Sequence, residues 1–315
     1  MAVAFIFPGQ GSQQVGMGKA LADAYPEAGA VFEEVDEALG EKLSDIIWQG
    51  PEERLTLTAN AQPALMAVSL AVVRVLEAKG VEIAGAAKYV AGHSLGEYSA
   101  LAAAGALTIA DAARLLRLRG SAMQKAVPVG EGAMAALLGL DYPAAVEIAG
   151  EAAGFGVCQA ANDNAPGQVV VSGARTAVER AIEIAAHKGA KRAILLPVSA
   201  PFHCALMAPA AEAMAEALAR TEIRPASVPV VCNVTAMPVS DPEEIRKRLV
   251  EQITGTVRWR ESVTFMARNG VDTLYELGAG RILTGLAKRI DRALNAQAIG
   301  TPEEIEAHAP ELARK

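Results

Sequence analysis

The serine in the middle of the segment GHSLG (92–96) has the setting of a nucleophile. The segment is a GxSxG motif between a predicted strand and a predicted helix. Its glycines let the chain turn sharply and expose the hydroxyl, and N–H groups at the start of the helix can stabilise an oxyanion. The Leu95 N–H is the natural first donor. The motif predicts nucleophilic chemistry at Ser94, although short motifs of this kind also occur in ordinary turns.

A serine hydroxyl needs a neighbouring base, and the chain has four histidines. His93 is next to the nucleophile in sequence, so its side chain leaves the turn in another direction, and we expect it to support the loop. His187 lies in a predicted helix and His308 in a charged segment, where both are expected to be solvated. His203 lies in a proline-bearing loop and is the predicted base. The alternative for it is a loop histidine that bonds only to the backbone.

Two glycine-bearing turns follow predicted strands. GQGSQ (9–13) is neither a P-loop nor a dinucleotide fingerprint, because no Gly-Lys-Ser/Thr follows and position 14 is Gln. Its glycines allow a substrate to approach the backbone, with the Gln10 N–H as a second oxyanion donor. A plain strand-to-helix turn is the alternative. The turn at 278–280 fits a phosphate- or pantetheine-facing loop, and a structural turn fits it equally well.

Arg119 is a candidate partner for a carboxylate. It belongs to RLLRLRG (114–120), and such runs usually form a solvated helix face. Its spacing from Arg114 puts it on a different side of the helix, and a guanidinium fork suits a carboxylate bidentately. Gln62 and Gln252 are amides in apolar surroundings, where both can be core polar groups with satisfied hydrogen bonds.

The elements around these residues predict an α/β protein. VAFIF (3–7) is a continuous apolar run typical of a buried parallel strand. A helix is predicted over 63–79, a strand over 88–94 and a helix from Leu95 onward. Further strands are expected at 228–233 and 272–278, and an Ala-rich helix after Pro209.

The middle of the chain predicts a separate small domain. Its expected elements follow the order β-α-β-β-α-β of ferredoxin-like domains, with the two central strands joined by the polar turn NDNAPG (162–167). These elements are 133–140, 143–152, 156–161, 167–173, 174–188 and 191–196. We predict a small domain at 126–198, inserted into a larger domain made of 1–125 and 199–315.

Composition excludes several classes of protein. The chain has 315 residues, 52% of them hydrophobic, and a net charge of −7, which argues against a nucleic-acid binder. Three cysteines without a CxxC pair disfavour a disulfide framework or a zinc site, and favour a reducing cytoplasm. The N-terminal segment lacks the basic start of a signal peptide. The uncharged stretch 55–73 contains polar residues and proline and is predicted to be core, not a membrane span.

Seven segments together resemble one known family. They are FPGQGSQ (7–13), QPAL (62–65), GHSLGE (92–97), RGSAMQ (119–124), NAPGQVVVSG (164–173), PFHCALM (201–207) and GAGRILTGL (278–286). Each is weak alone, but in this order over the whole chain they resemble the malonyl-CoA:acyl carrier protein transacylase family. They are also similar to the acyltransferase domains of polyketide and fatty acid synthases.

The resemblance implies an α/β-hydrolase-like core with a parallel sheet and a ferredoxin-like insertion. It also implies transfer of malonyl from malonyl-CoA to the phosphopantetheine thiol of holo acyl carrier protein, for fatty acid biosynthesis, by a ping-pong mechanism through a Ser94 ester. The implied roles are Ser94 as nucleophile, His203 as base, Gln10 and Leu95 as oxyanion donors, and Arg119 as the ligand of the malonyl carboxylate.

Two further positions carry family implications. Gln252 falls in the segment whose backbone carbonyl orients the histidine, although VEQITGTVRW (250–259) matches the family only loosely. Phe202, before the histidine, resembles the pattern of malonyl-specific acyltransferases and makes a methylmalonyl preference less expected.

The resemblance also sets expectations for partners. Coenzyme A thioester enters as a substrate, and no metal, redox cofactor or other bound cofactor is implied. We expect a cytoplasmic monomer that binds neither nucleic acid nor membrane. Because acyl carrier protein is acidic, a basic docking surface is expected at Lys191, Arg192, Lys288 and Arg289, with ordinary surface charge as the alternative.

Two other functions compete with this prediction. An α/β-hydrolase, such as an esterase or acyl-CoA thioesterase, shares GxSxG and the core. Hydrolases place the acid before the histidine and the histidine near the C-terminus, whereas His203 is far from the end of this chain, no HGGG-type loop occurs and Arg119 would have no role. A non-catalytic carrier-binding protein would not need the Ser94, His203 and Arg119 set.

Overall fold

The computed structural model describes residues 2–314 and contains two β-sheets. The larger sheet has the strand order β10-β9-β1-β2-β7-β8. Its strands are β1 (Ala2–Phe7), β2 (Ala87–Gly92), β7 (Val230–Val231), β8 (Pro238–Val239), β9 (Val271–Leu277) and β10 (Asn295–Ile299). All neighbours pair in parallel except β7 and β8. This is a mixed α/β architecture built on a mainly parallel sheet.

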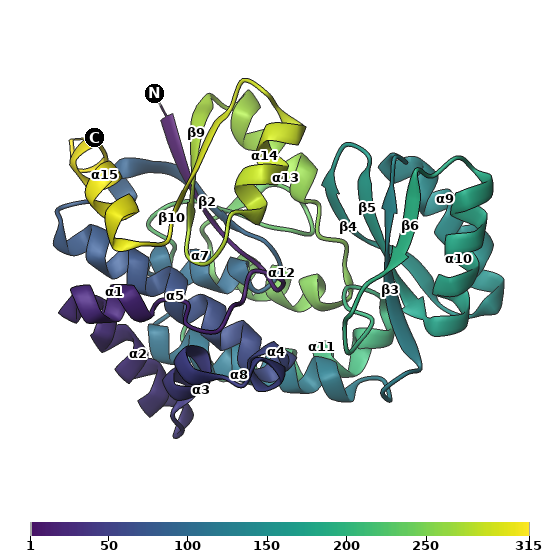
Figure 1. Ribbon diagram of the computed structural model, residues 1–315, viewed down its shortest axis with the longest axis horizontal. Helices are drawn as coiled ribbons and strands as arrows, with labels where there is room; N and C mark the ends of the chain where they lie inside the picture. Colours follow the sequence, from purple (N-terminus) through teal and green to yellow (C-terminus); the bar gives the residue numbers. More distant parts are fainter. Residues whose placement is uncertain (1, 315) are drawn as a thin grey trace.

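The continuous apolar run of β1 is buried because helices cover both faces of the sheet. Val3, Phe5 and Phe7 belong to one hydrophobic cluster, and the alternate residues Ala4 and Ile6 belong to another. The first cluster includes α5 (Thr58–Ala78), and the second includes α13 (Trp259–Arg268) and α14 (Ile282–Ile290). In Figure 1, α5 and α14 accordingly lie on opposite sides of the central strands.

The remaining helices surround this core. They are α1 (Lys19–Ala24), α2 (Pro26–Leu39), α3 (Leu43–Gln49), α4 (Glu52–Thr56), α6 (Ile83–Ala86), α7 (Gly96–Ala103), α8 (Ile109–Lys125), α11 (Ala208–Arg220), α12 (Pro242–Thr254) and α15 (Pro302–Leu312), with a short 3₁₀ helix at Ala205–Met207. By length and composition α5 could cross a membrane, but 83% of its apolar window is buried inside the protein. This burial agrees with the prediction of a core helix.

The second, small sheet is antiparallel and has the strand order β4-β5-β3-β6. Its elements are β3 (Gly132–Leu138), α9 (Tyr142–Ala152), a 3₁₀ turn (Ala153–Phe155), β4 (Cys158–Ala165), β5 (Gln168–Ala174), α10 (Arg175–His187) and β6 (Arg192–Leu195). One face of the sheet packs on α9 and α10 in a core of its own. Figure 1 shows this unit at one side of the molecule, beside the larger sheet.

The prediction of a polar turn at 162–167 is wrong. Strand β4 continues through Ala165, and only residues 166 and 167 separate it from β5. The polar residues stay in the strand because they have partners elsewhere: the Asp163 N–H donates to the Val257 carbonyl, and the Asp163 carboxylate pairs with Arg260. These contacts join the small sheet to the segment before α13 and to the first turn of α13.

The predicted bounds of one helix and one strand also differ from those in the structure. Helix α5 begins at Thr58, earlier than the predicted 63, because Pro63 lies inside the helix and not at its start. A proline at this position removes one intrahelical hydrogen bond, and its ring crowds the carbonyl four residues earlier. The strand expected over 228–233 is reduced to Val230–Val231, since the chain turns back into β8.

Candidate active site

Ser94 lies in a sharp turn between β2 and α7. Its φ is 53°, in the left-handed region that non-glycine residues rarely adopt. A Cβ on Gly92 would lie 1.9 Å from the Gly96 carbonyl carbon, and a Cβ on Gly96 would lie 2.3 Å from the Phe7 oxygen. The GxSxG glycines are therefore required by close backbone contacts, and the turn presents the serine at the carboxyl edge of the sheet.

His203 is placed directly against this serine. Its Nε2 lies 2.7 Å from Ser94 Oγ, and its Nδ1 lies 2.9 Å from the Gln252 carbonyl oxygen. Because a carbonyl can only accept, Nδ1 carries the proton and Nε2 is free to accept from the serine hydroxyl. The segment 250–259, which the sequence aligned only loosely, thus supplies a carbonyl in the orienting position.

The surroundings of His203 keep its ring neutral. His203 is 4% exposed, and its backbone φ of 58° lies in the left-handed region. Burial, and next the positive charge of Arg119, lower the pKa of His203 to about 3. The ring is therefore neutral at ordinary pH, which leaves Nε2 free to accept the hydrogen bond of the serine hydroxyl.

Arg119 extends from α8 into the same site. It is 1% exposed, and among residues 2–314 it forms no ion pair. Its Nη1 donates to Gln62 Oε1 at 2.8 Å, and its Nη2 donates to Gln252 Oε1 at 2.8 Å and to Ser94 Oγ at 3.1 Å. Burial lowers the pKa of the guanidinium. The structure therefore holds a buried cation beside Ser94 with neutral partners: two amides, the serine hydroxyl and the Tyr98 ring, 5.8 Å from the guanidinium carbon to the ring centroid.

These residues border a cavity of about 560 Å³. Its polar lining includes Gln10, Gln62, Ser94, Arg119 and His203. Its apolar lining comes from both parts of the chain and comprises Leu95, Met123, Met134, Val170, Leu196, Val198 and Phe202. The cavity therefore lies between the larger sheet and the small sheet, and both proposed oxyanion residues border it.

His93 points away from Ser94, as the sequence suggested. Its Nε2 lies 2.8 Å from Asn164 Oδ1, and its ring packs on Trp259 at a centroid distance of 5.6 Å. Burial lowers the pKa of His93. The residue connects the serine turn to β4 of the small sheet.

Sequence reasoning missed two residues that support the serine turn. Asn233 accepts the Ser94 N–H at 2.7 Å through Oδ1 and donates to the Gly92 carbonyl at 2.7 Å through Nδ2. Glu97 is 1% exposed and accepts from the Asn233 N–H at 3.0 Å and from Gln252 Nε2 at 2.9 Å. The only sequence signal was an acid at the end of GHSLGE and an amide after the strand VPVVC.

The four basic residues predicted for docking are exposed, and three of them, Lys191, Arg192 and Arg289, contact one end of the small sheet. Arg192 is opposite Leu138, Leu138 is opposite Gln168, and Arg289 Nη1 donates to Gln168 Oε1 at 2.8 Å. Residues directly opposite each other in a sheet share a face, and so do residues two apart in one strand. Gln168 therefore lies on the same face as the cavity residue Val170. Arg192 and Arg289 therefore lie toward the face of the small sheet that carries Val170, but none of the four basic residues lines the cavity.

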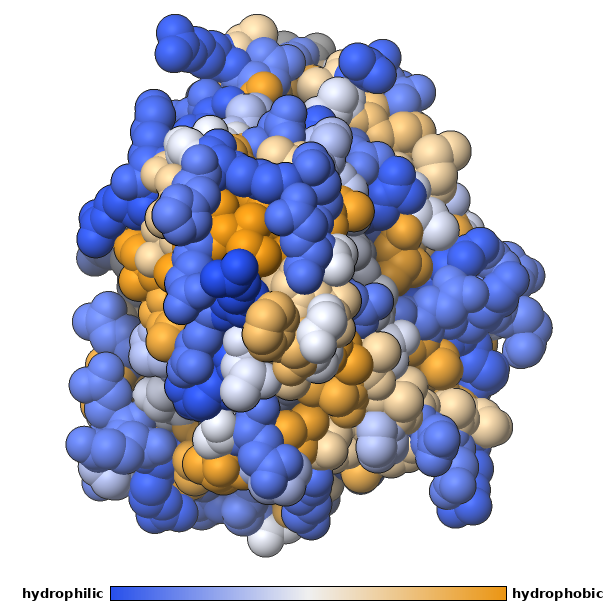
Figure 2. Space-filling model, turned by 90° about the vertical axis from the view of Figure 1, so that its right-hand side faces the viewer, coloured by the Kyte–Doolittle hydropathy of each residue, from blue (hydrophilic) through white to orange (hydrophobic). Residues whose placement is uncertain are grey.

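The outer side of the small sheet is mixed in character. Figure 2 shows this side of the molecule, where hydrophilic side chains dominate and hydrophobic ones form patches between them. The exposed hydrophobic side chains of this part of the chain are Val129, Val146, Phe155, Ile194 and Leu195.

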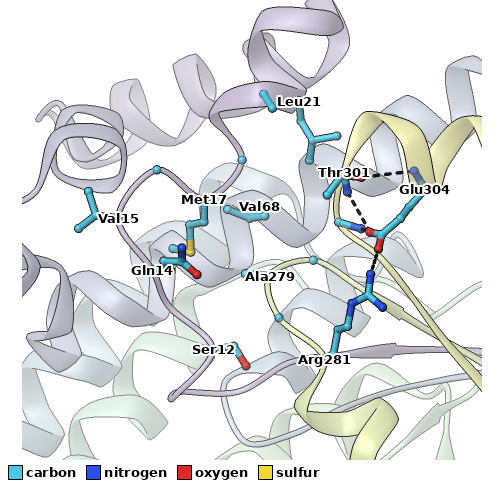
Figure 3. Close-up of a pocket in the computed structure, with 16 residues that line it drawn as sticks. Ser12, Gln14, Val15, Met17, Leu21, Val68, Ala279, Arg281, Thr301 and Glu304 are labelled. Atoms are coloured by element: carbon cyan, nitrogen blue, oxygen red, sulfur yellow. Dashed lines mark hydrogen bonds and ion pairs between the residues drawn. The ribbon is translucent and has the colours of Figure 1, made fainter.

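The glycine turn at 278–280 does not border the serine cavity. It lines another hollow of about 370 Å³, which shares no lining residue with the first. Figure 3 shows this hollow, where Glu304 accepts from the Gly300 and Thr301 N–H groups and pairs with Arg281. The chain's own carboxylate thus takes the anion position at the start of α15, and a pantetheine-facing role for this turn finds no support in the geometry.

A serine hydroxyl bonded to a histidine of fixed tautomer, with a buried guanidinium beside it, forms a site on this α/β fold that can support acyl transfer. The sequence profile of a family described as acyl transferase domain matches residues 4–296. The chain belongs to this acyl transferase family.

Individual relatives are similar to this chain over nearly their whole length. The chain is 48% identical over 305 residues to a protein of Bacillus subtilis named malonyl CoA-acyl carrier protein transacylase, covering 96% of this chain and 95% of that protein. It is 48% identical over 304 residues to the protein of the same name from Escherichia coli K12, covering 96% and 97%.

Solved structures show the same similarity. The crystal structure of an acyl-carrier-protein S-malonyltransferase from Bartonella henselae matches with a TM-score of 0.97 and 59% identity, over 99% of both chains. A malonyl-transacylase solved in complex with a type II PKS acyl-carrier protein matches with a TM-score of 0.95 and 44% identity, over 99% of this chain and 100% of that one.

Proposed function

We propose that this protein is a serine acyltransferase that moves malonyl from malonyl-CoA to the phosphopantetheine thiol of acyl carrier protein, in fatty acid biosynthesis. The observation that carries the proposal is the position of the Arg119 guanidinium, 3.1 Å from Ser94 Oγ inside the serine cavity. In a malonyl group, one methylene separates a free carboxylate from the carbonyl that the serine attacks. The names of the relatives support the same reaction.

In the first half-reaction, Ser94 Oγ attacks the thioester carbonyl carbon and His203 Nε2 takes the hydroxyl proton. The backbone N–H groups of Gln10 and Leu95 stabilise the oxyanion, and one such donor contributes about 2.7–4 kcal/mol in comparable sites. The tetrahedral intermediate collapses, the carbon–sulfur bond breaks, and the coenzyme A sulfur leaves with the proton from His203. The product is a malonyl ester on Ser94.

In the second half-reaction, the phosphopantetheine thiol gives its proton to His203 and attacks the ester carbonyl. The carbon–oxygen bond to Ser94 breaks, and His203 returns the proton to the serine oxygen. The two half-reactions use the same histidine in alternating roles, and the ester between them makes the mechanism ping-pong. Neither half-reaction calls on a metal or a bound cofactor.

Arg119 selects the acyl group in this mechanism. A buried guanidinium gains most from a substrate that brings its own negative charge, and an acetyl or longer alkyl group leaves that charge uncompensated. The neutral partners Gln62 and Gln252 hold the side chain without neutralising it. The site therefore favours acyl groups with a free carboxylate.

The two sheets have distinct parts in this proposal. Residues 1–125 and 199–315 form an α/β-hydrolase-like catalytic domain, and 126–198 form a ferredoxin-like domain that closes one side of the cavity. The carrier protein docks at Lys191, Arg192, Lys288 and Arg289, a proposal supported by the exposure of these residues and by the contacts of Arg192 and Arg289 with one end of the small sheet. The protein acts as a cytoplasmic monomer.

The transfer reaction itself is tested with malonyl-CoA and purified acyl carrier protein, by following malonyl-carrier formation by mass spectrometry. We expect product with holo carrier, none with apo carrier, which lacks the thiol, and none with the Ser94→Ala variant. Release of free malonate at the same rate with or without holo carrier would indicate a thioesterase. Absence of both products would leave a carrier-binding protein.

A further inference from the structure

Glu97 is a buried carboxylate that the proposed reaction does not use. It lies in the first turn of α7, directly after the serine turn, and is 1% exposed. Its Oε2 accepts hydrogen bonds from the Asn233 N–H at 3.0 Å and from Gln252 Nε2 at 2.9 Å. A buried charge of this kind is costly unless it is well bonded, so its presence beside the nucleophile requires an explanation.

The Gln252 amide lies between Glu97 and a charge of opposite sign. Its Nε2 donates to Glu97 Oε2 and to the Ser94 carbonyl, whereas its Oε1 accepts from Arg119 Nη2. If the amide turned over, its oxygen would face the carboxylate and its N–H groups would face the guanidinium. Both contacts would then be repulsive, so the two charges together hold the amide in one orientation.

This orientation determines how Arg119 is presented. The Gln252 oxygen and the Gln62 oxygen are the acceptors for its two terminal nitrogens. A direct ion pair with Glu97 would neutralise the guanidinium, whereas a neutral amide between them fixes its position and leaves its charge for a ligand. Glu97 thus acts on the substrate-binding group through Gln252.

We propose that Glu97 is a positioning residue, whose ionised carboxylate orients Gln252 and, through it, holds Arg119 in place for acyl groups that carry a free carboxylate. This inference rests on the proposed malonyl transfer. It predicts that loss of the Glu97 charge reduces selectivity for malonyl over acetyl more than it reduces acyl transfer itself.

The charge of Glu97 changes within an accessible pH range. Burial raises the pKa of Glu97 to about 7, although its bonds to Asn233 and Gln252 act in the opposite direction. The charged and titratable groups that face it are Arg119 from α8, the Cys232 thiol after β7 and the Tyr98 hydroxyl of its own helix. The pKa of His203 lies at about 3, so the base does not titrate in the same range, and a change in selectivity near pH 7 reports on Glu97.

The test compares kcat/KM for malonyl-CoA and for acetyl-CoA between pH 5.5 and 8.5, with holo carrier as acceptor. In the wild type, the malonyl-to-acetyl ratio should be constant at high pH and fall below pH 7, as Glu97 is protonated. In Glu97→Gln, the ratio at pH 8 should fall roughly ten-fold, the effect of weakening one charge-assisted hydrogen bond. It should also lose its dependence on pH, and acetyl transfer should fall by a smaller factor than malonyl transfer.

Glu276→Gln is the matched control. Glu276 is also fully buried, but its carboxylate accepts from the Leu283 and Thr284 N–H groups at the start of α14. We expect this variant to lose thermal stability and keep the wild-type ratio and its pH dependence. Thermal unfolding of both variants at pH 8 shows whether any loss of selectivity reflects unfolding.

The outcomes distinguish a failure of the proposed malonyl transfer from a failure of the role proposed for Glu97. A wild type that transfers malonyl no better than acetyl at every pH would contradict the proposed function. A malonyl-selective wild type with a flat ratio across the pH range would overturn only the role of Glu97. So would a Glu97→Gln variant that loses malonyl and acetyl transfer equally.

Discussion

His203 Nε2 lies 2.7 Å from Ser94 Oγ, and both residues hold left-handed backbone conformations, with φ of 58° and 53°. Such conformations cost roughly 1–3 kcal/mol each in non-glycine residues and persist only where surrounding contacts fix them. Asn233 supplies one such contact by accepting the Ser94 N–H. The hydrogen bond between the reacting groups is therefore set by the backbone of two turns that meet.

The tightness of the serine turn can be tested at Gly96. In Gly96→Ala, the new Cβ would lie 2.3 Å from the Phe7 oxygen, so the turn must shift away from β1. We expect transfer activity to fall at least a hundred-fold and stability to fall by about 3 kcal/mol, measured by kinetics and urea unfolding.

Gly150→Ala is the control for this change. Gly150 lies in α9, and a Cβ there meets no atom within 4 Å. This variant should keep full activity and gain roughly 0.5–1 kcal/mol of stability from higher helix propensity. A fully active Gly96→Ala would show that the close contact with β1 is unimportant.

Removal of Arg119 should reduce selectivity as well as rate. Loss of a charged hydrogen-bond partner costs about 1.5–3 kcal/mol, so Arg119→Ala should lower malonyl transfer about 10- to 150-fold and narrow the gap to acetyl-CoA. Arg117→Ala is the control on the same helix, because Arg117 pairs with Glu41 and Asn60 and does not border the cavity. Unchanged malonyl selectivity in Arg119→Ala would disprove the carboxylate role.

Acid should destabilise the protein through His203. Its pKa is about 3 in the folded protein and about 6.5 in an unfolded chain. Between these values only the unfolded state gains the proton, so stability is lost as pH falls from 6.5 to 3, by on the order of 5 kcal/mol for this group. Urea unfolding across this range should show a shallower acid loss in His203→Gln; identical slopes would contradict the buried neutral imidazole.

Carrier docking can be separated from malonyl-CoA binding. Charge reversal at Arg192 and Arg289 should raise KM for acyl carrier protein several-fold and leave KM for malonyl-CoA unchanged, because complementary charge acts mainly on encounter. Lys247→Glu on α12 is the control, as an exposed lysine away from this end of the small sheet. Equal effects on both substrates, or an equal effect of the control, would reject the docking surface.

Sequence reasoning succeeded where the signal was local. The apolar run of β1, the strand–turn–helix around Ser94 and the order of elements in the small sheet agree with the structure. The histidine was found by elimination, because only four exist and three had an unsuitable setting. Arg119 gained its assignment from the family resemblance, and its burial beside Ser94 agrees with that assignment.

Sequence reasoning failed where a residue's role depends on distant partners. Asn162 and Asp163 were assigned to a turn by their polarity, yet the Val257 segment and Arg260 hold them in a strand. Asn233 and Glu97 are far apart in the sequence and meet only after β2 and β7 pair. No periodicity or local motif encodes such contacts.

The most direct test of the account is the intact mass of the protein after incubation with malonyl-CoA, beside Ser94→Ala. We predict the mass of one malonyl group added to the wild type, none added to the variant, and its loss on addition of holo acyl carrier protein. An adduct that persists in Ser94→Ala, or one that water removes as fast as the carrier does, would contradict transfer through a Ser94 ester.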